Sequence, residues 1–361
     1  GGVLDFFVFA GATPAQVVQQ AQYAVLGRPM MPPLWSLGWQ YCRWGFENLA
    51  HVKRVTQQLA NHAIPFDTMY FDIDYMHAYE MFTYDDERFP ATEVKQWVDT
   101  ELHAKGRRLV VILDPGIHVR EGYDVYERAK AQGDVFLKTR EGTDFIGSVW
   151  PGRVHFPDWS STGARQWWLT ELREFLKLAP IDGLWIDMNE VANFCHGQCT
   201  DDDDDDWNIG LLEERESKYH RAADFNPRNP PYRIKNTAGR HVDLNYKTLD
   251  MDVQFVDGNI EYDVHSTFGH REGILTAEDL AELRQERPFV LSRSTTLSSG
   301  HWMAHWLGDN RSDFYSMRRS IAGMLNFQLF GIPMVGADIC GFAAEFGNMN
   351  ELCARWTALG R

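Results

Sequence analysis

The chain has 361 residues, of which 44% are hydrophobic, enough for one large α/β domain or two ordinary domains. Its formal charge of −16 argues against nucleic acid as a partner, because phosphates would be repelled. The charge fits a protein that acts on neutral substrates, and it equally fits a solvated acidic surface. No apolar run approaches the roughly 20 residues of a membrane span.

The first residues, "GGVLDFFVFAG", have the composition of a strand with nothing before it to pair with. We therefore expect residues 1–12 to be the end of an N-terminal β-sandwich, and the chain to be a piece of a longer protein. No signal peptide is recognisable at this end. Thr13-Pro14-Ala15-Gln16 has the form of a capping box with proline at the first helical position, which predicts a helix to Gly27.

From Ser36 onward, apolar strand-like segments alternate with helical patterns, which indicates parallel βα units. Strands are expected in 36–41, 66–75, 108–115, 182–190, 287–294, 304–310 and 332–342, and helices in 51–64, 93–106, 163–178 and 276–286. No dinucleotide-binding glycine fingerprint is present, so a (β/α)8 barrel over residues 13–361 is preferred to a Rossmann domain. Seven strands are found, and we expect a TIM-type barrel truncated before its eighth strand. Such an open barrel, expressed alone, is expected to be poorly soluble and inactive.

Two insertions interrupt the alternation, at about 116–149 and about 195–259. The second contains six consecutive aspartates, residues 201–206. A calcium-binding EF-hand loop requires spaced ligands, a central glycine and a terminal glutamate, so we interpret the run as a solvated, self-repelling loop. The strand ends lack the clustered histidines of a metal enzyme. We therefore expect neither a metal nor a cofactor.

The carboxyl ends of the strands form the active face of a barrel, and here they are rich in carboxylates and tryptophans. The residues at these ends are Trp44, Asp72, Asp74, Asp114, Asp187, Glu190, Arg293, Trp306, Asp309 and Asp338. A single aspartate could simply cap the following helix. Six strands that end this way favour a sugar pocket, because carboxylates accept hydrogen bonds from hydroxyl groups and tryptophan stacks on a pyranose ring.

Glycoside hydrolysis requires one carboxylic acid and one carboxylate that serves as base or nucleophile. Asp187 and Asp309 are the leading pair, because each has a tryptophan nearby in sequence that lowers the local dielectric constant. Asp309 also follows Gly308, which permits a substrate to approach closely. Spacing does not assign which of the two keeps its proton.

The segment "GLWIDMNEVANF" resembles the nucleophile signature of glycoside hydrolase family 31, the α-glucosidases. "RPFVLSRST", "HWLGDN" and "GIPMVGADICGF" resemble later blocks of that family, and "MPPLWSLGWQYCRWGF" and "EYDVHSTFGH" resemble its other landmarks, all in order. The resemblance covers almost the whole chain and is strongest to the acid α-glucosidase and maltase branch. Two departures are "VANF" in place of the family's "PSNF" and the absence of a strand with an Asn-His-Asn motif after "RWTALG".

The resemblance implies a retaining, exo-acting α-glucosidase that removes terminal non-reducing α-linked glucose from maltose, malto-oligosaccharides or other starch-derived substrates. It also implies a secreted protein or one of the lysosomal or vacuolar lumen. An α-xylosidase or an α-glucan lyase of the same family, or an inactive carbohydrate-binding fragment, are the alternatives.

Carried over residue by residue, the resemblance makes Asp187 the nucleophile, Asp309 the general acid/base and Glu190 the second acid of the signature. Substrate contacts fall on Asp72, Arg293 and Asp338. The implied pocket walls are Trp44, Ile112, Trp150, Trp185, Met188, Trp306 and Phe342. The cysteines, at positions 42, 195, 199, 340 and 353, would form the family's disulfides Cys195–Cys199 and Cys340–Cys353 and leave Cys42 over.

Overall fold

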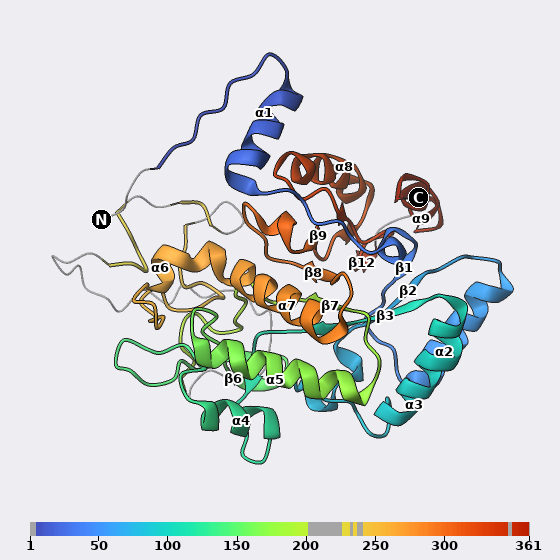
Figure 1. Ribbon diagram of the computed structural model, residues 1–361, viewed down its shortest axis with the longest axis horizontal. Helices are drawn as coiled ribbons and strands as arrows, with labels where there is room; N and C mark the ends of the chain where they lie inside the picture. The colour runs from blue at the N-terminus through green and yellow to red at the C-terminus, as the bar shows by residue number, and fades with distance from the viewer. Residues whose placement is uncertain (1–4, 201–225, 232–233, 237–240, 346–348, 361) are drawn as a thin grey trace.

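A seven-stranded parallel sheet forms the centre of the molecule (Figure 1). The computed structural model describes residues 5–200, 226–231, 234–236, 241–345 and 349–360, so the aspartate run at 201–206 lies outside the described residues. The strands are β1 (Gln40–Tyr41), β2 (Thr68–Phe71), β3 (Arg108–Leu113), β7 (Gly183–Ile186), β8 (Val290–Ser292), β9 (Ala304–Trp306) and β11 (Val335–Gly336).

Each strand of this sheet pairs in parallel with its neighbour in the order β1-β2-β3-β7-β8-β9-β11. This order confirms the predicted curled sheet of a (β/α) barrel with seven strands. Within the described part of the chain, β1 and β11 do not pair with each other, so both are edge strands. The parallel arrangement brings all the carboxyl ends to one rim, which places the predicted polar residues together.

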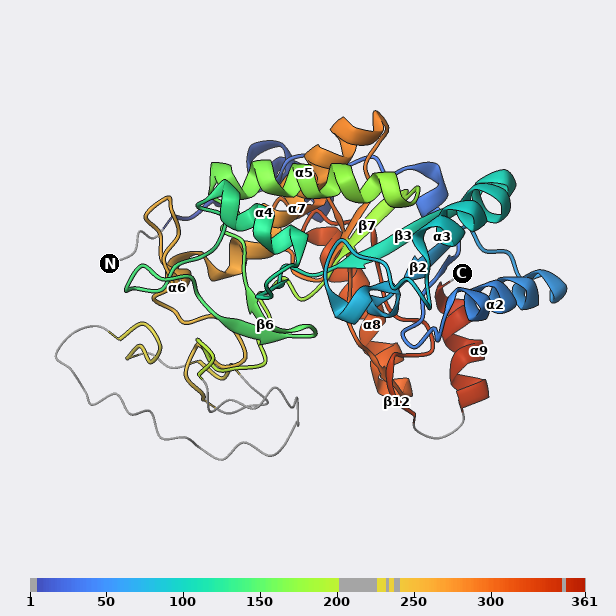
Figure 2. The same cartoon turned by 90° about the horizontal axis from the view of Figure 1, so that it is seen from below.

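Helices cover the outer face of the sheet (Figures 1 and 2). They are α2 (Leu49–Asn61), α3 (Ala91–Trp97, continued by helical turns to Lys105), α5 (Thr162–Leu178), α7 (Phe268–Arg284), α8 (Phe314–Leu329) and α9 (Met349–Gly360). Figures 1 and 2 show α5 and α7 side by side, and α5 buries large aromatic side chains of its own, such as Trp168 and Phe175. Burial of each ring contributes roughly 2–3 kcal/mol. No helix in the described ranges is long and apolar enough to cross a membrane.

Several expected boundaries were wrong. The strand predicted for 36–41 is only two residues long, because Leu34–Leu37 forms a 3-10 turn. Helix α7 begins at Phe268, eight residues before the predicted position 276. Its first turns contain Gly269 and Gly273, which lower helix propensity. A Cβ at Gly269 would lie 2.6 Å from the Asn189 carbonyl oxygen, so close packing explains the glycine.

The insertion predicted as loop-rich at 116–149 contains regular structure. Its strands β4 (Ile117–His118) and β5 (Gly147–Val149) pair with β6 (Gly152–His155), which directly follows the predicted insertion, in an antiparallel sheet, and it also contains α4 (Asp124–Gln132). Strands of two to four residues carry too few alternations to be recognised from sequence. In the second insertion, the described residues between 195 and 259 contain no helix or named strand.

The N-terminal region is only partly as predicted. The helix expected after Thr13 is α1 (Pro14–Ala21), followed by a π-helical turn from Gln22 to Leu26. The Thr13 side chain accepts the predicted capping hydrogen bond from the Gln16 amide. Residues 5–10 form no strand, and Phe6, Phe7 and Val8 are exposed. A strand requires a partner for its backbone groups, and none of the described strands pairs with this segment. The β-sandwich assignment stays a prediction.

Candidate active site

Polar side chains follow the main strands at the carboxyl rim, as predicted. Asp72, Asp114, Asp187 and Arg293 come directly after β2, β3, β7 and β8. Trp306 is the last residue of β9. Asp309 and Asp338 follow β9 and β11 by three and two residues, and Trp44 follows β1 by three.

Arg293 joins two carboxylates at the centre of this rim. Its Nη1 lies 2.9 Å from Asp187 Oδ1, while Nε and Nη2 donate to the two Glu190 oxygens at 2.8 and 3.0 Å. Asp187 Oδ1 also accepts from the Met188 amide at 2.7 Å. A bidentate guanidinium fixes the orientation of its partners, so Glu190 holds Arg293 against Asp187. Arg293 therefore neutralises the aspartate without covering both of its oxygens.

The carboxyl groups of the site are electrostatically linked. Burial raises the pKa of Asp187 to about 6, although the Arg293 guanidinium opposes this effect. Burial also raises the pKa of Asp309, again against Arg293. For Asp338, burial and the negative charges of Asp309 and Asp187 raise the pKa to about 7. Burial raises the pKa of Asp72 to about 8, although the Ile73 amide hydrogen bond opposes it. The carboxyl groups of this site therefore retain protons near neutral pH.

Asp114 is the most deeply buried of these groups, and the sequence did not give it a role. Its side chain is fully buried, and neither carboxyl oxygen has a hydrogen-bond partner. Burial and the charge of Asp187 raise the pKa of Asp114 well above its ordinary value. We interpret it as a neutral carboxylic acid beneath the site.

This burial leads to a prediction about stability. A carboxyl whose pKa is raised on folding stabilises the fold at low pH, and that contribution is lost as pH rises from the unfolded pKa toward the folded one. The variant Asp114→Asn cannot ionise, so its Tm relative to wild type should be higher at pH 7.5 than at pH 5. Thermal unfolding at the two pH values measures the difference. A shift of equal size at both would contradict the assignment.

The predicted aromatic walls form two groups. Trp185 and Trp306 meet edge to face with ring centroids 5.3 Å apart, and both are nearly buried. Trp44 lies 6.0 Å from Trp150 and stacks on Phe342 at 6.1 Å. Trp44 is 42% exposed and Phe342 is 40% exposed, so this second group lies at the rim of the site.

The two aliphatic walls lie deeper. Ile112 is fully buried within β3, where it pairs in register with Trp185. Met188 is 6% exposed, and its sulfur lies 3.2 Å from Arg293 Nη2. Their assignment as pocket walls stays a prediction.

Asn189 was missed in the sequence. It is fully buried, its Nδ2 donates to Ser292 Oγ at 3.0 Å, and its Oδ1 accepts from the Ser294 amide at 2.9 Å. These bonds tie the loop after β7 to the end of β8, and thereby align Asp187 with Arg293. The sequence signal that could have found Asn189 is an amide side chain between the two acids of "DMNE". A polar side chain that is buried at the end of a strand requires hydrogen-bond partners.

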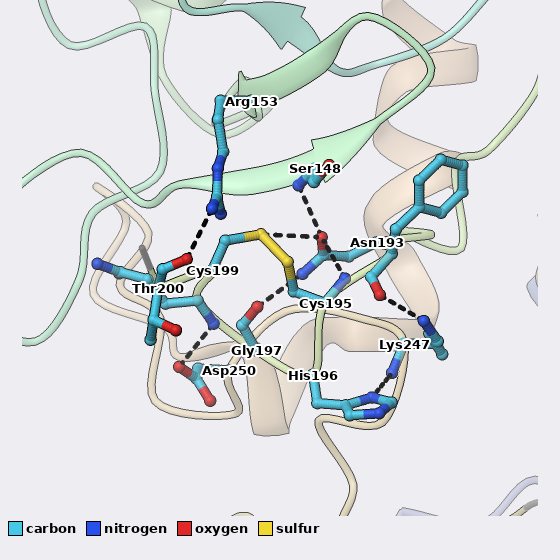
Figure 3. Close-up of a disulfide and its surroundings, with 12 residues drawn as sticks. Ser148, Arg153, Asn193, Cys195, His196, Gly197, Cys199, Thr200, Lys247 and Asp250 are labelled. Carbon is cyan, nitrogen blue, oxygen red and sulfur yellow. Dashed lines mark hydrogen bonds between the residues drawn. A yellow bond between two sulfur atoms is a disulfide. The ribbon is translucent and has the colours of Figure 1, made fainter. Parts of the chain in front are cut away.

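Both disulfides implied by the resemblance are present, Cys195–Cys199 and Cys340–Cys353, and Cys42 is free and exposed. Figure 3 shows the first bridge beside Asn193. The Asn193 Oδ1 accepts from the amides of Ser148 and Cys195 at 2.9 and 3.3 Å, and Nδ2 donates to the Gly197 carbonyl at 2.7 Å. This side chain therefore attaches the loop after Glu190 to strand β5.

The sequon Asn310-Arg311-Ser312 follows Asp309 directly, and we predict that it stays unglycosylated. The Asn310 Nδ2 is buried, and the backbone carbonyl of Asn310 accepts from the Phe342 amide at 2.7 Å. An attached glycan would have to displace this packing. Intact-peptide mass spectrometry of protein expressed through a secretory pathway should find the unmodified peptide, and a glycan at Asn310 would contradict the placement of the site.

Comparison with known proteins places the chain in a family. Residues 29–361 match the model of the glycosyl hydrolases family 31 TIM-barrel domain. All of the chain aligns with a probable alpha-glucosidase of Oryza sativa subsp. japonica at 42% identity, and with alpha-xylosidase 1 of Arabidopsis thaliana at 41%. It spans 37% and 39% of the lengths of these two relatives.

Solved structures agree with this result. The ER glucosidase II heterodimeric complex, which contains its catalytic subunit, matches 98% of the chain and 33% of its own chain, with a TM-score of 0.78 and 28% identity. A family 31 alpha-glucosidase from Bacteroides thetaiotaomicron matches 97% of the chain and 48% of its own, with a TM-score of 0.71 and 27% identity. The chain belongs to glycosyl hydrolases family 31.

Proposed function

We propose that the protein is an exo-acting retaining α-glucosidase that removes terminal non-reducing α-linked glucose from maltose and malto-oligosaccharides. The observation that carries the proposal is Asp187, held by Arg293 and Glu190, in the same electrostatic cluster as Asp309. The relatives named alpha-glucosidase, from Oryza sativa and Hordeum vulgare, support this substrate class. The two disulfides support an oxidising compartment, such as the exterior or the lysosomal or vacuolar lumen.

In the proposed reaction, the Asp187 carboxylate attacks the anomeric carbon while Asp309 protonates the departing glycosidic oxygen. A glycosyl ester forms at Asp187. Asp309, now ionised, then takes a proton from water, which attacks the anomeric carbon and releases glucose with retained configuration. Each step uses one of the two carboxyls as acid or base, so no other proton carrier is required.

The remaining polar groups hold the sugar in the proposed complex. Asp72, Asp338 and Arg293 bind its hydroxyl groups, and their number accounts for preference for a fully hydroxylated ring. Trp185 and Trp306 supply the apolar surface for the ring face. Asp72 and Asp338 have raised pKa values, so they can donate as well as accept hydrogen bonds.

One observation supports the α-xylosidase alternative: the chain is 41% identical to alpha-xylosidase 1 of Arabidopsis thaliana. Hydrolysis of p-nitrophenyl α-glucoside and α-xyloside by the full-length gene product distinguishes the two. The proposal expects glucose release with a kcat/KM at least about tenfold above that for xylose. Faster xylose release would establish the α-xylosidase. An unsaturated or anhydro sugar product would indicate a lyase, and release of neither sugar from a folded preparation would indicate a binding fragment.

A further inference from the structure

Glu80 forms a buried ion cluster that none of the predicted roles uses. Its side chain is 1% exposed, and its oxygens contact His118 Nδ1 at 2.7 Å and Arg120 Nε and Nη2 at 2.5 and 2.8 Å. Burial alone would raise the pKa of Glu80, but His118 and Arg120 lower it to about 2. The Glu80 carboxyl is therefore ionised in the mildly acidic and neutral range. Removal of one partner from such a buried cluster is costly, so it fixes the position of the segments that it joins.

The two partners of Glu80 belong to the inserted antiparallel sheet and the residues directly after its first strand, β4. His118 is in β4, which pairs with β6 through His118↔Val154, and β6 pairs with β5. The turn between β5 and β6 contains Trp150. Because β4, β6 and β5 are paired in one small sheet, the position of His118 and Arg120 helps to fix the position of Trp150.

The segment that carries Glu80 also contributes an aromatic residue. Tyr79, the preceding residue, is 36% exposed, and its ring lies 6.4 Å from that of Trp150. Trp150 also contacts Trp44 at 6.0 Å. Tyr79 therefore extends the aromatic surface outward from the predicted pocket wall. Glu80 holds both members of the Tyr79–Trp150 pair, one through its own backbone and the other through its side chain.

We propose that the Tyr79–Trp150 pair binds the second sugar unit of a malto-oligosaccharide, and that Glu80 is the positioning residue that holds the pair in place. This inference rests on the proposed α-glucosidase function. Tyr79 is exposed, Trp150 is partly buried, and their ring planes are 56° apart, so together they can contact the apolar faces of a sugar beyond the buried terminal unit. Tyr123, whose hydroxyl donates to the Met81 carbonyl at 2.7 Å, is a second attachment between the two segments, so the loss of Glu80 should displace the pair without unfolding the sheet.

The test compares two substrates in the full-length gene product. Maltotriose occupies the second-sugar position, whereas α-glucosyl fluoride carries only the terminal unit. In Glu80→Gln, the KM for maltotriose should rise about tenfold, while kcat and the KM for α-glucosyl fluoride change less than about twofold. Tyr79→Asn should give the same split, since asparagine tolerates the positive φ of 60° at this position. The double variant should raise the KM for maltotriose no further than the more severe of the two single variants does, because Glu80 acts through the pair.

Glu171→Gln is the matched control. Glu171 is also 1% exposed and makes a bidentate ion pair with Arg128 at 2.7 Å on α4 and α5. The variant Glu171→Gln should lower Tm as much as Glu80→Gln does and leave the KM values for maltotriose and α-glucosyl fluoride unchanged. If Glu80→Gln does not fold, Arg120→Gln is the alternative, because the Arg120 side chain is half-exposed. It should raise the KM for maltotriose by a smaller factor and leave the KM for α-glucosyl fluoride unchanged.

Equal changes with both substrates, or an unchanged KM for maltotriose in a folded Glu80→Gln or in Tyr79→Asn, would overturn this inference alone. A folded wild type that releases glucose from neither substrate would overturn the proposed function and this inference with it.

Discussion

Asp187→Asn is expected to reduce kcat on maltose by on the order of 10⁴-fold or more while the protein stays folded. Asparagine is isosteric and can still accept from the Met188 amide, which contacts Asp187 Oδ1 at 2.7 Å. It lacks the negative charge that attacks the anomeric carbon, and it also loses the ion pair with Arg293. Steady-state kinetics with maltose, together with circular dichroism, measures the two expectations.

Asp182→Asn is the control for this variant, because it makes the same substitution just before the opposite end of the same strand. Asp182 precedes β7, accepts from the Leu109 amide at 2.9 Å and pairs with Arg284 at 3.1 Å. At this end of a barrel, residues contribute to stability. Asp182→Asn should lower Tm and change kcat less than about twofold. If both variants lost activity in proportion to stability, Asp187 would have no chemical role.

Asp309→Ala is expected to separate two kinds of substrate. Activity on maltose should fall by about 10²–10⁴-fold, because the departing sugar oxygen requires a proton. Aryl α-glucosides with good leaving groups require little protonation, so their loss should be much smaller in the first, glycosylation step. Comparison of kcat/KM for maltose and for p-nitrophenyl α-glucoside gives the result, and equal losses on both would argue against the role.

The pH profile of the same variant provides an independent check. Activity of the wild type requires ionised Asp187, so it should fall as pH drops through that group's pKa, which burial raises. Activity also requires protonated Asp309, whose pKa burial raises as well, so it should fall at higher pH. The result is a bell on the acidic side of neutrality. Asp309→Ala should keep the acidic limb and lose the alkaline limb.

The main sheet could be predicted from the sequence because its strands are short apolar runs between clear helical patterns. Strands such as β3 and β7 are fully buried on both faces, and hydrophobic composition alone reveals them. The start of α7 and the β4–β6–β5 sheet could not be predicted. They depend on packing of glycines against a distant loop and on pairing between short segments, which are tertiary effects.

The candidate site was predictable to the extent that it consists of strand ends. A parallel barrel brings these ends together whatever the loops do, so Asp187, Arg293 and Asp309 could be grouped in advance. Asn189 and Glu80 could not be assigned, because each acts through partners about 40 to 100 residues away in the chain.

The most direct test of the central claim is covalent trapping with 5-fluoro-α-glucosyl fluoride. The fluorine at C5 slows both steps, and the fluoride leaving group lets the glycosyl-enzyme accumulate. Peptic digestion and tandem mass spectrometry of the inactivated full-length gene product should locate the sugar on Asp187. A label on Asp309, Glu190 or any other carboxylate would contradict the account.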